Sequence, residues 1–159
     1  MKKIFKKIVV SLLTLEARAV LFRYRPKIVA VVGSVGKTTT KDMLAVVLAQ
    51  KFTVRKSPKS FNSEIGLPLA ILGVEKSEWE SFSGWCAVLL KGLAVIFSVC
   101  SYPEWLVLEV GADHPGDISR VATWLTPECV VVTRFGETPV HLEFFPSRDA
   151  LIEEKASLV

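Results

Sequence analysis

The sequence predicts an α/β protein with a doubly wound, mostly parallel sheet and a phosphate-binding loop. Apolar runs of strand length alternate with segments of helical periodicity, which is typical of a parallel sheet. The runs at 27–32, 105–110 and 128–133 are almost continuously apolar, as in strands covered on both faces. The first run leads directly into a glycine-rich turn and a helix, an arrangement that binds nucleotide phosphates.

Length and composition limit what the chain can be. Its 159 residues suffice for one hydrophobic core, 50% of them are hydrophobic, and the mean hydropathy is +0.40. Residues 1–27 carry eight Lys and Arg and one acid, a net charge of +7, whereas the remainder carries twelve Lys and Arg and fifteen acids, a net −3. The basic charge therefore belongs to the N-terminal segment, and the body of the protein gives no indication of nucleic-acid binding.

The three cysteines, Cys86, Cys100 and Cys129, have no C-x-x-C spacing. They indicate neither a zinc site nor a disulfide framework, and free thiols suit a reducing cytosol. We expect all three to be small, buried, apolar residues.

Residues 2–24 are predicted to form a basic amphipathic helix, because apolar side chains recur at helical spacing and most Lys and Arg fall on the other face. Three interpretations stay open: an export signal, a helix that lies on an anionic membrane surface, and a helix packed on the domain. The phosphate loop that follows soon afterwards argues against export.

The loop at 33–39 has the chemistry of a phosphate site. Gly33 and Gly36 allow a tight turn with inward-facing N–H groups, and the positive end of the next helix faces the same point. Lys37 supplies a mobile cation for the β- and γ-phosphates, and the Thr38 hydroxyl can bind Mg²⁺. The common loop G-x-x-x-x-G-K-[ST] would need glycine in place of Val31. The shorter pattern found here predicts nucleotide binding but not the reaction.

Strands and helices continue to alternate after the loop. The first helix, 39–50, is expected to bury Met43, Leu44, Val47 and Leu48. The last helix has no C-terminal cap, so we expect the domain to be incomplete at its C-terminus. The other expected elements are strands at 52–55, 105–110 and 128–133, and helices at 65–72, 116–125 and 147–159.

Residues 85–102 are strongly apolar, interrupted by Lys91 and Gly92. Their length permits a membrane span, but a central lysine would cost about 3 kcal/mol there. A buried or surface-docked helix is therefore favoured over a transmembrane one.

Two more side chains fall at the same edge of the predicted sheet as the loop. Glu109 ends the strand at 105–110, and His141 follows the strand at 128–133. Ligands bind off the carboxyl ends of parallel strands, where a carboxylate can hold Mg²⁺. Alone, Glu109 would be an acid that ends a strand; with the loop it becomes a candidate metal ligand. Lys155 lies on the predicted last helix, and without further information we would expect it to be an ordinary solvent-exposed lysine.

Five blocks in order resemble the central ATP-binding domain of the Mur ligases. They are GSVGKTTTKDML, SFNSEIGLPLAIL, LVLEVGADHPGDI, TPECVVVTRFGETPVHLEFF and EEKASL. The resemblance covers residues 27–159 and leaves 1–26 as a separate basic helix. The short loop is this family's own version, although Val35 stands where the family often has Asn or Ser. The family's N-terminal UDP-sugar domain and its C-terminal domain have no counterpart in the chain.

The resemblance implies a role for each matching residue. Thr38 and Glu109 would hold one Mg²⁺, while Glu109, His141 and a carbamylated Lys155 would hold a second. Asn62 and Glu64 would lie on the substrate side, beside the reacting phosphate. The implied ATP-binding loop consists of Gly33, Ser34, Val35, Gly36, Lys37, Thr38 and Thr39.

The implied reaction uses ATP to phosphorylate a carboxylate, and an amine then attacks the acyl phosphate. The blocks at 62–68 and 109–118 are most similar to the member that adds D-Ala-D-Ala to a UDP-muramoyl peptide in peptidoglycan synthesis. We expect a monomeric cytoplasmic enzyme that uses ATP and Mg²⁺, with no nucleic-acid partner and with membrane contact through 2–24 left open. This piece alone is expected to be inactive. A nucleotide-binding module without ligase activity and a folylpolyglutamate synthase-like ligase remain alternatives.

Overall fold

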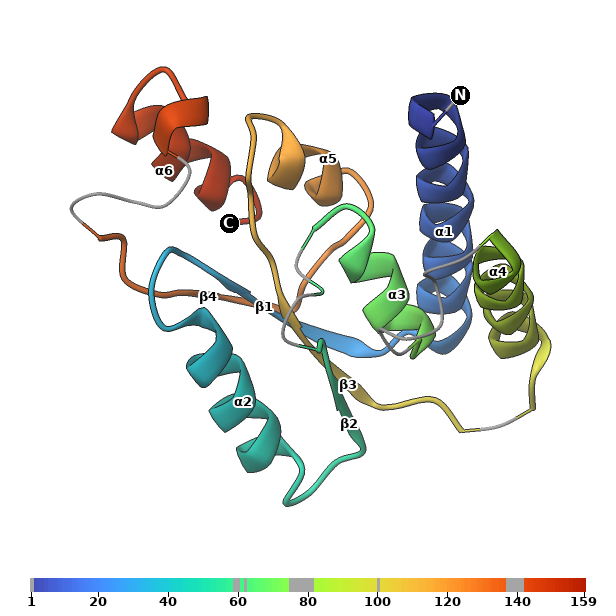
Figure 1. Ribbon diagram of the computed structural model, residues 1–159. Coiled ribbons are helices and arrows are strands. Elements are labelled where there is room, and N and C mark those ends of the chain that lie inside the picture. The colour runs from blue at the N-terminus through green and yellow to red at the C-terminus, as the bar shows by residue number, and fades with distance from the viewer. Residues whose placement is uncertain (1, 59–60, 62, 75–81, 100, 137–141) are drawn as a thin grey trace.

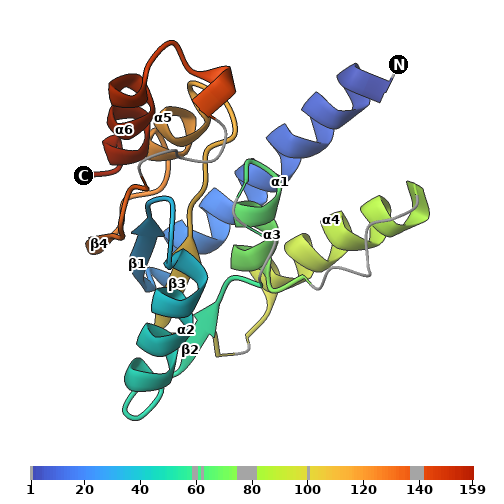
Figure 2. The same ribbon diagram turned by 60° about the vertical axis from the view of Figure 1, so that its left-hand side comes forward.

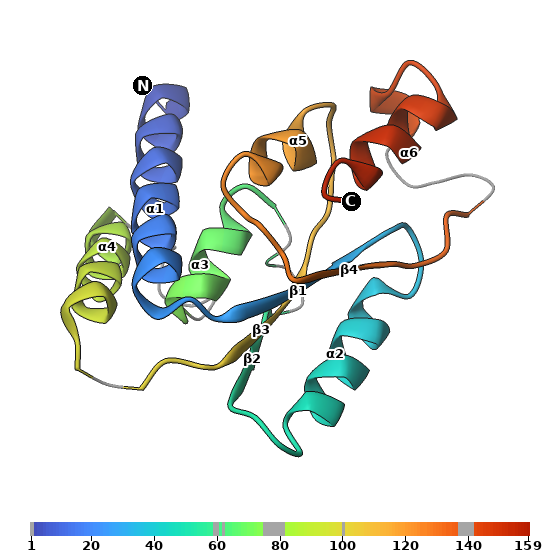
Figure 3. The same ribbon diagram turned by 180° about the vertical axis from the view of Figure 1, so that it is seen from behind.

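The computed structural model describes residues 2–58, 61, 63–74, 82–99, 101–136 and 142–159. Four parallel strands form one sheet in the order β2-β3-β1-β4. Helix α2 covers one face, and α1, α3 and α5 lie on the other (Figures 1 and 3). The predicted parallel α/β sheet is confirmed. Its strands are β1 (Lys27–Val32), β2 (Val54–Lys56), β3 (Trp105–Glu109) and β4 (Cys129–Val132). The helices are α1 (Lys2–Tyr24), α2 (Lys37–Leu48), α3 (Gly66–Leu72), α4 (Phe82–Phe97), α5 (Asp117–Ala122), the 3-10 helix η2 (Leu142–Phe144) and α6 (Arg148–Ala156).

Alternate residues of the central strands enter two separate cores. Ile28, Ala30 and Val32 of β1 join Leu106 and Leu108 of β3 in the larger core, beneath α1 and α3. The intervening residues, Val29, Val31 and Val107, pack against α2. This is the period-2 pattern of strands buried on both faces.

The predicted apolar face of α2 is half wrong. Leu44 and Leu48 pack on the sheet as expected, but Met43 and Val47 are exposed. The helix begins at Lys37, two residues earlier than expected, and its buried side includes Lys41 and Ala45. A polar side chain thus occupies a position on the inner face that hydrophobicity alone could not reveal.

Helix α1 packs on the domain, as one of the three interpretations required. Its buried residues, among them Leu13, Ala17 and Val20, belong to the larger core. At its C-terminal end the Tyr24 hydroxyl donates to the carbonyl of Val95 on α4 at 2.9 Å, and the Tyr24 ring stacks on that of Tyr102. Burial of this face therefore attaches α1 to both α3 and α4.

Residues 85–97 of the apolar segment at 85–102 belong to α4, which lies beside α1 (Figure 2). In the described part of the chain, no helix has the length and apolarity needed to cross a membrane. The expected surface-docked helix is the one found.

The expected burial of the cysteines is wrong where the structure describes them. Cys86 and Cys129 are exposed, and Cys100 lies outside the described residues. Cys86 lies on the outer side of α4, and Cys129 begins β4, which among the described strands pairs with β1 alone and so stands at the edge of the sheet.

Candidate nucleotide-binding site

The phosphate loop turns at the carboxyl end of β1 through two glycines. Gly33 has φ 128° and Gly36 has φ 86°, both in the region that favours glycine. A Cβ at Gly33 would also stand 2.9 Å from the carbonyl oxygen of Thr133, whereas a Cβ at Gly36 would meet nothing within 4 Å. Gly33 thus lets the loop pass β4, and Gly36 leaves open space at the start of α2.

The backbone donors available to an anion lie at the start of α2. Gly36 is the N-cap and no side chain caps the helix, so the N–H groups of Lys37, Thr38 and Thr39 have no partner within the helix. The N–H groups of Ser34 and Val35 instead donate to the Arg134 carbonyl at 3.2 and 3.1 Å. The inward-facing donors expected of the whole loop are therefore concentrated at the helix end, where the dipole also favours an anion.

Glu109 reaches the loop from the end of β3. The Thr38 hydroxyl donates to its carboxylate at 2.8 Å, and the Lys41 ammonium lies 3.8 Å from the same oxygen. Glu109 is 4% exposed and Lys41 is 1% exposed, so both charges are almost fully buried. Because Val31 of β1 is its register partner, Glu109 stands directly beside the strand that carries the loop.

Ser57 ties this buried pair to β2. The Lys41 ammonium donates to the Ser57 carbonyl at 2.8 Å, and the backbone N–H of Glu109 donates to the Ser57 hydroxyl at 2.9 Å. Buried charges persist when they are paired and hydrogen-bonded in this way. The carboxylate is consequently held in place before any ligand arrives.

Lys155 reaches the opposite side of the loop from α6. Its ammonium donates to the Ser34 hydroxyl at 3.3 Å and to the Gly33 carbonyl at 3.5 Å, and the residue is 4% exposed. Burial lowers the pKa of Lys155, the nearby charge of Lys37 lowers it further, and Asp113 opposes the shift. The environment thus favours a neutral amine more than water would.

The helix that carries Lys155 is fastened to α5 by the preceding residue. The Glu154 carboxylate accepts from the N–H groups of Ile118 and Ser119 at 2.7 and 2.9 Å, and from the Ser119 hydroxyl at 2.9 Å. These are the unpaired donors of the first turn of α5, so a side chain on α6 caps α5. Burial raises the pKa of Glu154, but the hydrogen bonds, led by that from Ser119, outweigh this effect and leave the pKa below its usual value.

We expect the stabilising contribution of Glu154 to be lost at acidic pH. A carboxylate whose pKa is lower in the folded chain than in the unfolded chain stabilises the fold above its unfolded pKa, and this stabilisation is lost as the pH falls through the folded value. Glu154→Gln should therefore destabilise the chain at pH 7 by about 1 kcal/mol, and the difference from the unaltered chain should shrink towards pH 3. Urea unfolding across this pH range measures both effects. The control is Glu153→Gln, at an exposed neighbouring residue. If the free energy of unfolding of the two variants depended on pH in the same way, this would contradict the capping of α5 by Glu154.

The donor set fits a magnesium-bound nucleotide. Thr38 and Glu109 place a hydroxyl and a carboxylate oxygen 2.8 Å apart, and oxygen ligands are those that Mg²⁺ prefers. The described residues contain no cluster of three His, Cys, Asp or Glu that could hold a metal by itself, and His141 lies outside them. A divalent ion here would share its coordination with phosphate oxygens and water, as magnesium commonly does.

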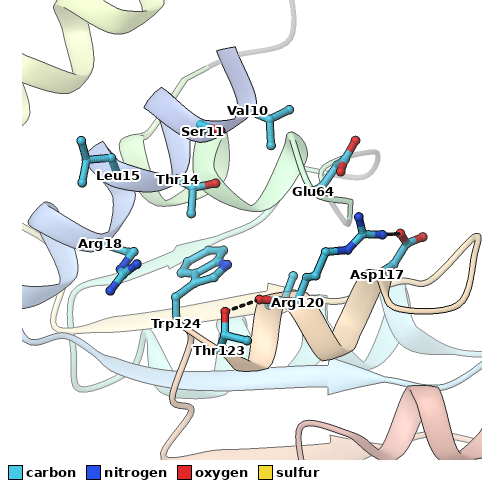
Figure 4. Close-up of a pocket in the computed structure, with 11 residues that line it drawn as sticks. Val10, Ser11, Thr14, Leu15, Arg18, Glu64, Asp117, Arg120, Thr123 and Trp124 are labelled. Atoms are coloured by element: carbon cyan, nitrogen blue, oxygen red, sulfur yellow. Dashed lines mark hydrogen bonds and ion pairs between the residues drawn. The ribbon is translucent and has the colours of Figure 1, made fainter. Parts of the chain in front are cut away.

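Glu64 lies apart from the contacts described so far. Its carboxylate pairs with the Lys6 ammonium of α1 at 2.9 Å and lines a pocket of about 340 Å³ between α1 and α5 (Figure 4). Trp124 and Arg120 form the α5 side of that pocket. No residue of the loop lines it, and Asn62, the other predicted substrate-side residue, lies outside the described residues.

Three residues of the site were not predicted from the sequence. The position of Lys41 could have been recognised in the sequence, because it follows Lys37 by one helical turn and therefore lies on the same side of the helix. Ser57 and Asp113 had none, because each acquires its role from the strand or helix that the fold places beside it.

Comparisons with known proteins agree on one family. The sequence profile of the Mur ligase middle domain matches residues 31–82 and 92–159. The chain is 30% identical over 143 residues to the UDP-N-acetylmuramoyl-tripeptide–D-alanyl-D-alanine ligase of Bacillus subtilis. This alignment covers 90% of this chain and 25% of that protein. Identity to the same-named ligase of Borreliella burgdorferi is 31% over 151 residues, covering 95% of this chain and 27% of that protein.

A solved structure extends the likeness to three dimensions. The MurF ligase of Thermotoga maritima, solved in complex with ADP, superposes with a TM-score of 0.68 at 32% identity, over 94% of this chain and 29% of that one. The chain therefore spans about a quarter of the length of the relatives that it matches.

Proposed function

The chain belongs to the Mur ligase middle domain family, and on this premise we propose that it is the ATP-binding part of an ATP-dependent amide ligase. The reaction would phosphorylate a carboxylate and join it to an amine, and the substrates would be a UDP-muramoyl peptide and D-Ala-D-Ala. Relatives that bear the name of this ligase support the choice of substrates. The site of action would be the cytoplasm.

The observation that carries the proposal is the contact between Thr38 and Glu109 at the start of α2. It joins the loop to the acid of the neighbouring strand at 2.8 Å. The related Thermotoga ligase was solved in complex with ADP, which supports nucleotide binding by this chain. In this arrangement the N–H groups at the start of α2 and the Lys37 ammonium would hold the β- and γ-phosphates.

Each remaining residue takes one task in the proposed mechanism. Thr38 and Glu109 would hold one Mg²⁺, and Glu109, His141 and modified Lys155 a second. The ions would supply charge neutralisation as the γ-phosphoryl group moves between two anions. Lys37 would follow the phosphoryl group with its mobile ammonium, while buried Lys41 would keep the Glu109 carboxylate oriented. Asn62 and Glu64 would face the substrate, Glu64 from the pocket between α1 and α5 rather than from the phosphate loop.

Carbamylation of Lys155 fits the environment of its amine. The neutral amine attacks the carbon of CO₂, a proton leaves the nitrogen, and the product is an N-carboxylate. Burial and the Lys37 charge lower the pKa of Lys155 and so raise the fraction of neutral amine. The modification would turn a cation beside Ser34 into an oxygen ligand for a metal ion.

A ligase assay tests the proposed function directly. The protein encoded by the complete reading frame should consume ATP only when both UDP-muramoyl tripeptide and D-Ala-D-Ala are present, with ADP, phosphate and the pentapeptide formed in equal amounts. An ATP hydrolysis rate that does not depend on either substrate would contradict the ligase assignment. Turnover with a folate and glutamate instead would assign the chain to another ligase.

A further inference from the structure

Helix α1 carries a second apolar stripe that the fold does not bury. Phe5, Ile8, Leu12, Leu15 and Phe22 recur at intervals of three, four and seven residues, which places them on one side of the helix. All are exposed, Leu15 to 63% and Phe22 to 78%. The opposite side of α1, which includes Leu13 and Val20, faces the larger core.

Helix α4 repeats this arrangement. Cys86, Leu90, Leu93 and Phe97 follow one another at intervals of four, three and four residues and are exposed, Leu90 to 66% and Phe97 to 76%. Its inner side, with Val88, packs in the core. The helices α1 and α4 lie side by side and extend away from the sheet (Figures 1 and 2). We refer to their two outer stripes together as the α1–α4 face.

The charge around this face has one sign. The sequence of the two helices contains seven Lys and Arg and one acid, Glu16. Glu16 is buried between the helices, where Gly92 makes room for its carboxyl group, and burial raises its pKa to about 7. Exposed charge on the two helices is therefore basic, including Lys7 and Arg18.

The family profile does not account for this face. Its match begins at residue 31, after α1, and omits residues 83–91, the first half of α4.

We propose that the α1–α4 face docks on the surface of an anionic lipid bilayer. An apolar stripe bordered by Lys and Arg is the pattern of helices that lie in the membrane interface. A second copy of the chain is a poor occupant, because residues 1–27 carry a net charge of +7 and two such surfaces would repel each other. The helices lie on the bilayer rather than cross it, since no described helix could span one.

Vesicle sedimentation of the full chain tests this proposal. The chain should bind vesicles of phosphatidylcholine with phosphatidylglycerol, bind phosphatidylcholine alone at least about tenfold more weakly, and lose binding as salt rises. Leu90→Glu with Phe97→Glu should reduce binding at least about tenfold, and so should Lys7→Gln with Arg18→Gln. The matched control is Val47→Glu on α2, a residue with 68% exposure; it should bind like the unaltered chain. Circular dichroism checks that each variant is folded.

Three results would overturn the proposal. The first is a folded chain that does not sediment with anionic vesicles. This includes a chain that forms dimers or binds an acidic protein but does not bind the vesicles. The second is equal affinity for neutral and anionic vesicles. The third is an equal loss in Val47→Glu, which would indicate unspecific apolar adsorption.

Discussion

Lys37→Ala should weaken ATP binding roughly 10- to 100-fold, because the variant loses a charge-assisted contact with the phosphates. Lys37 stands at the first position of α2, beside the open space left by Gly36, and among the described residues its ammonium donates only to the Ser34 carbonyl, at 3.5 Å. The side chain is therefore available to a ligand, and its removal should leave the fold intact. Nucleotide titration by calorimetry, with Mg²⁺ present, measures the loss.

Lys51→Ala is the control for this experiment. Lys51 is an exposed lysine just beyond the other end of α2, so its removal subtracts the same charge away from the loop. The control should bind ATP as the unaltered chain does. Unchanged affinity in Lys37→Ala, or equal losses in both variants, would contradict the phosphate-loop assignment.

Lys155→Ala should lower the ligase rate of the complete protein about 100- to 1000-fold, the scale expected when a fixed charge partner is removed from a reacting centre. The side chain is 4% exposed and contacts Ser34 and Gly33, so its removal leaves a buried space beside the loop. Carbamylation predicts a specific rescue: formate or acetate should enter the vacated space and partly restore the rate. Steady-state kinetics with increasing carboxylate measure this rescue.

The rescue has two controls. The same carboxylates should not accelerate the unaltered enzyme, and they should not rescue Lys37→Ala, whose missing group is a cation. Full activity in Lys155→Ala would remove the residue from the site. Loss without rescue would support a lysine that acts as an amine and would contradict the modification.

The sequence predicted the parts of the site that depend on local pattern. The hydrophobic periodicity shows where a strand ends and where a helix begins. The loop and Glu109 could therefore be located from the sequence. The direction of the Glu109 side chain could also be predicted, because it is two residues from Val107 and both face α2.

The parts that the sequence did not reveal depend on contacts between distant elements. Lys155 entered the predicted site only through the family resemblance, because it comes beside the loop when Glu154 caps α5, an interaction across 35 residues that no local pattern indicates. Lys41 was missed because a buried lysine is rare, and only the positions of Glu109 and Ser57 explain its burial. Cys129 was expected to be buried because cysteine is a small apolar residue, but its strand β4 lies at the edge of the described sheet.

The central claim is that the start of α2, Glu109 and Lys155 surround one magnesium-bound nucleotide. A crystal structure with a non-hydrolysable ATP analogue and Mn²⁺, with the ion located from its anomalous signal, tests it most directly. We predict an Mn²⁺ peak bound to the Thr38 hydroxyl and the Glu109 carboxylate, with the β- and γ-phosphates on the N–H groups of Lys37, Thr38 and Thr39. Nucleotide bound elsewhere, or an ion that touches neither Thr38 nor Glu109, would contradict the claim.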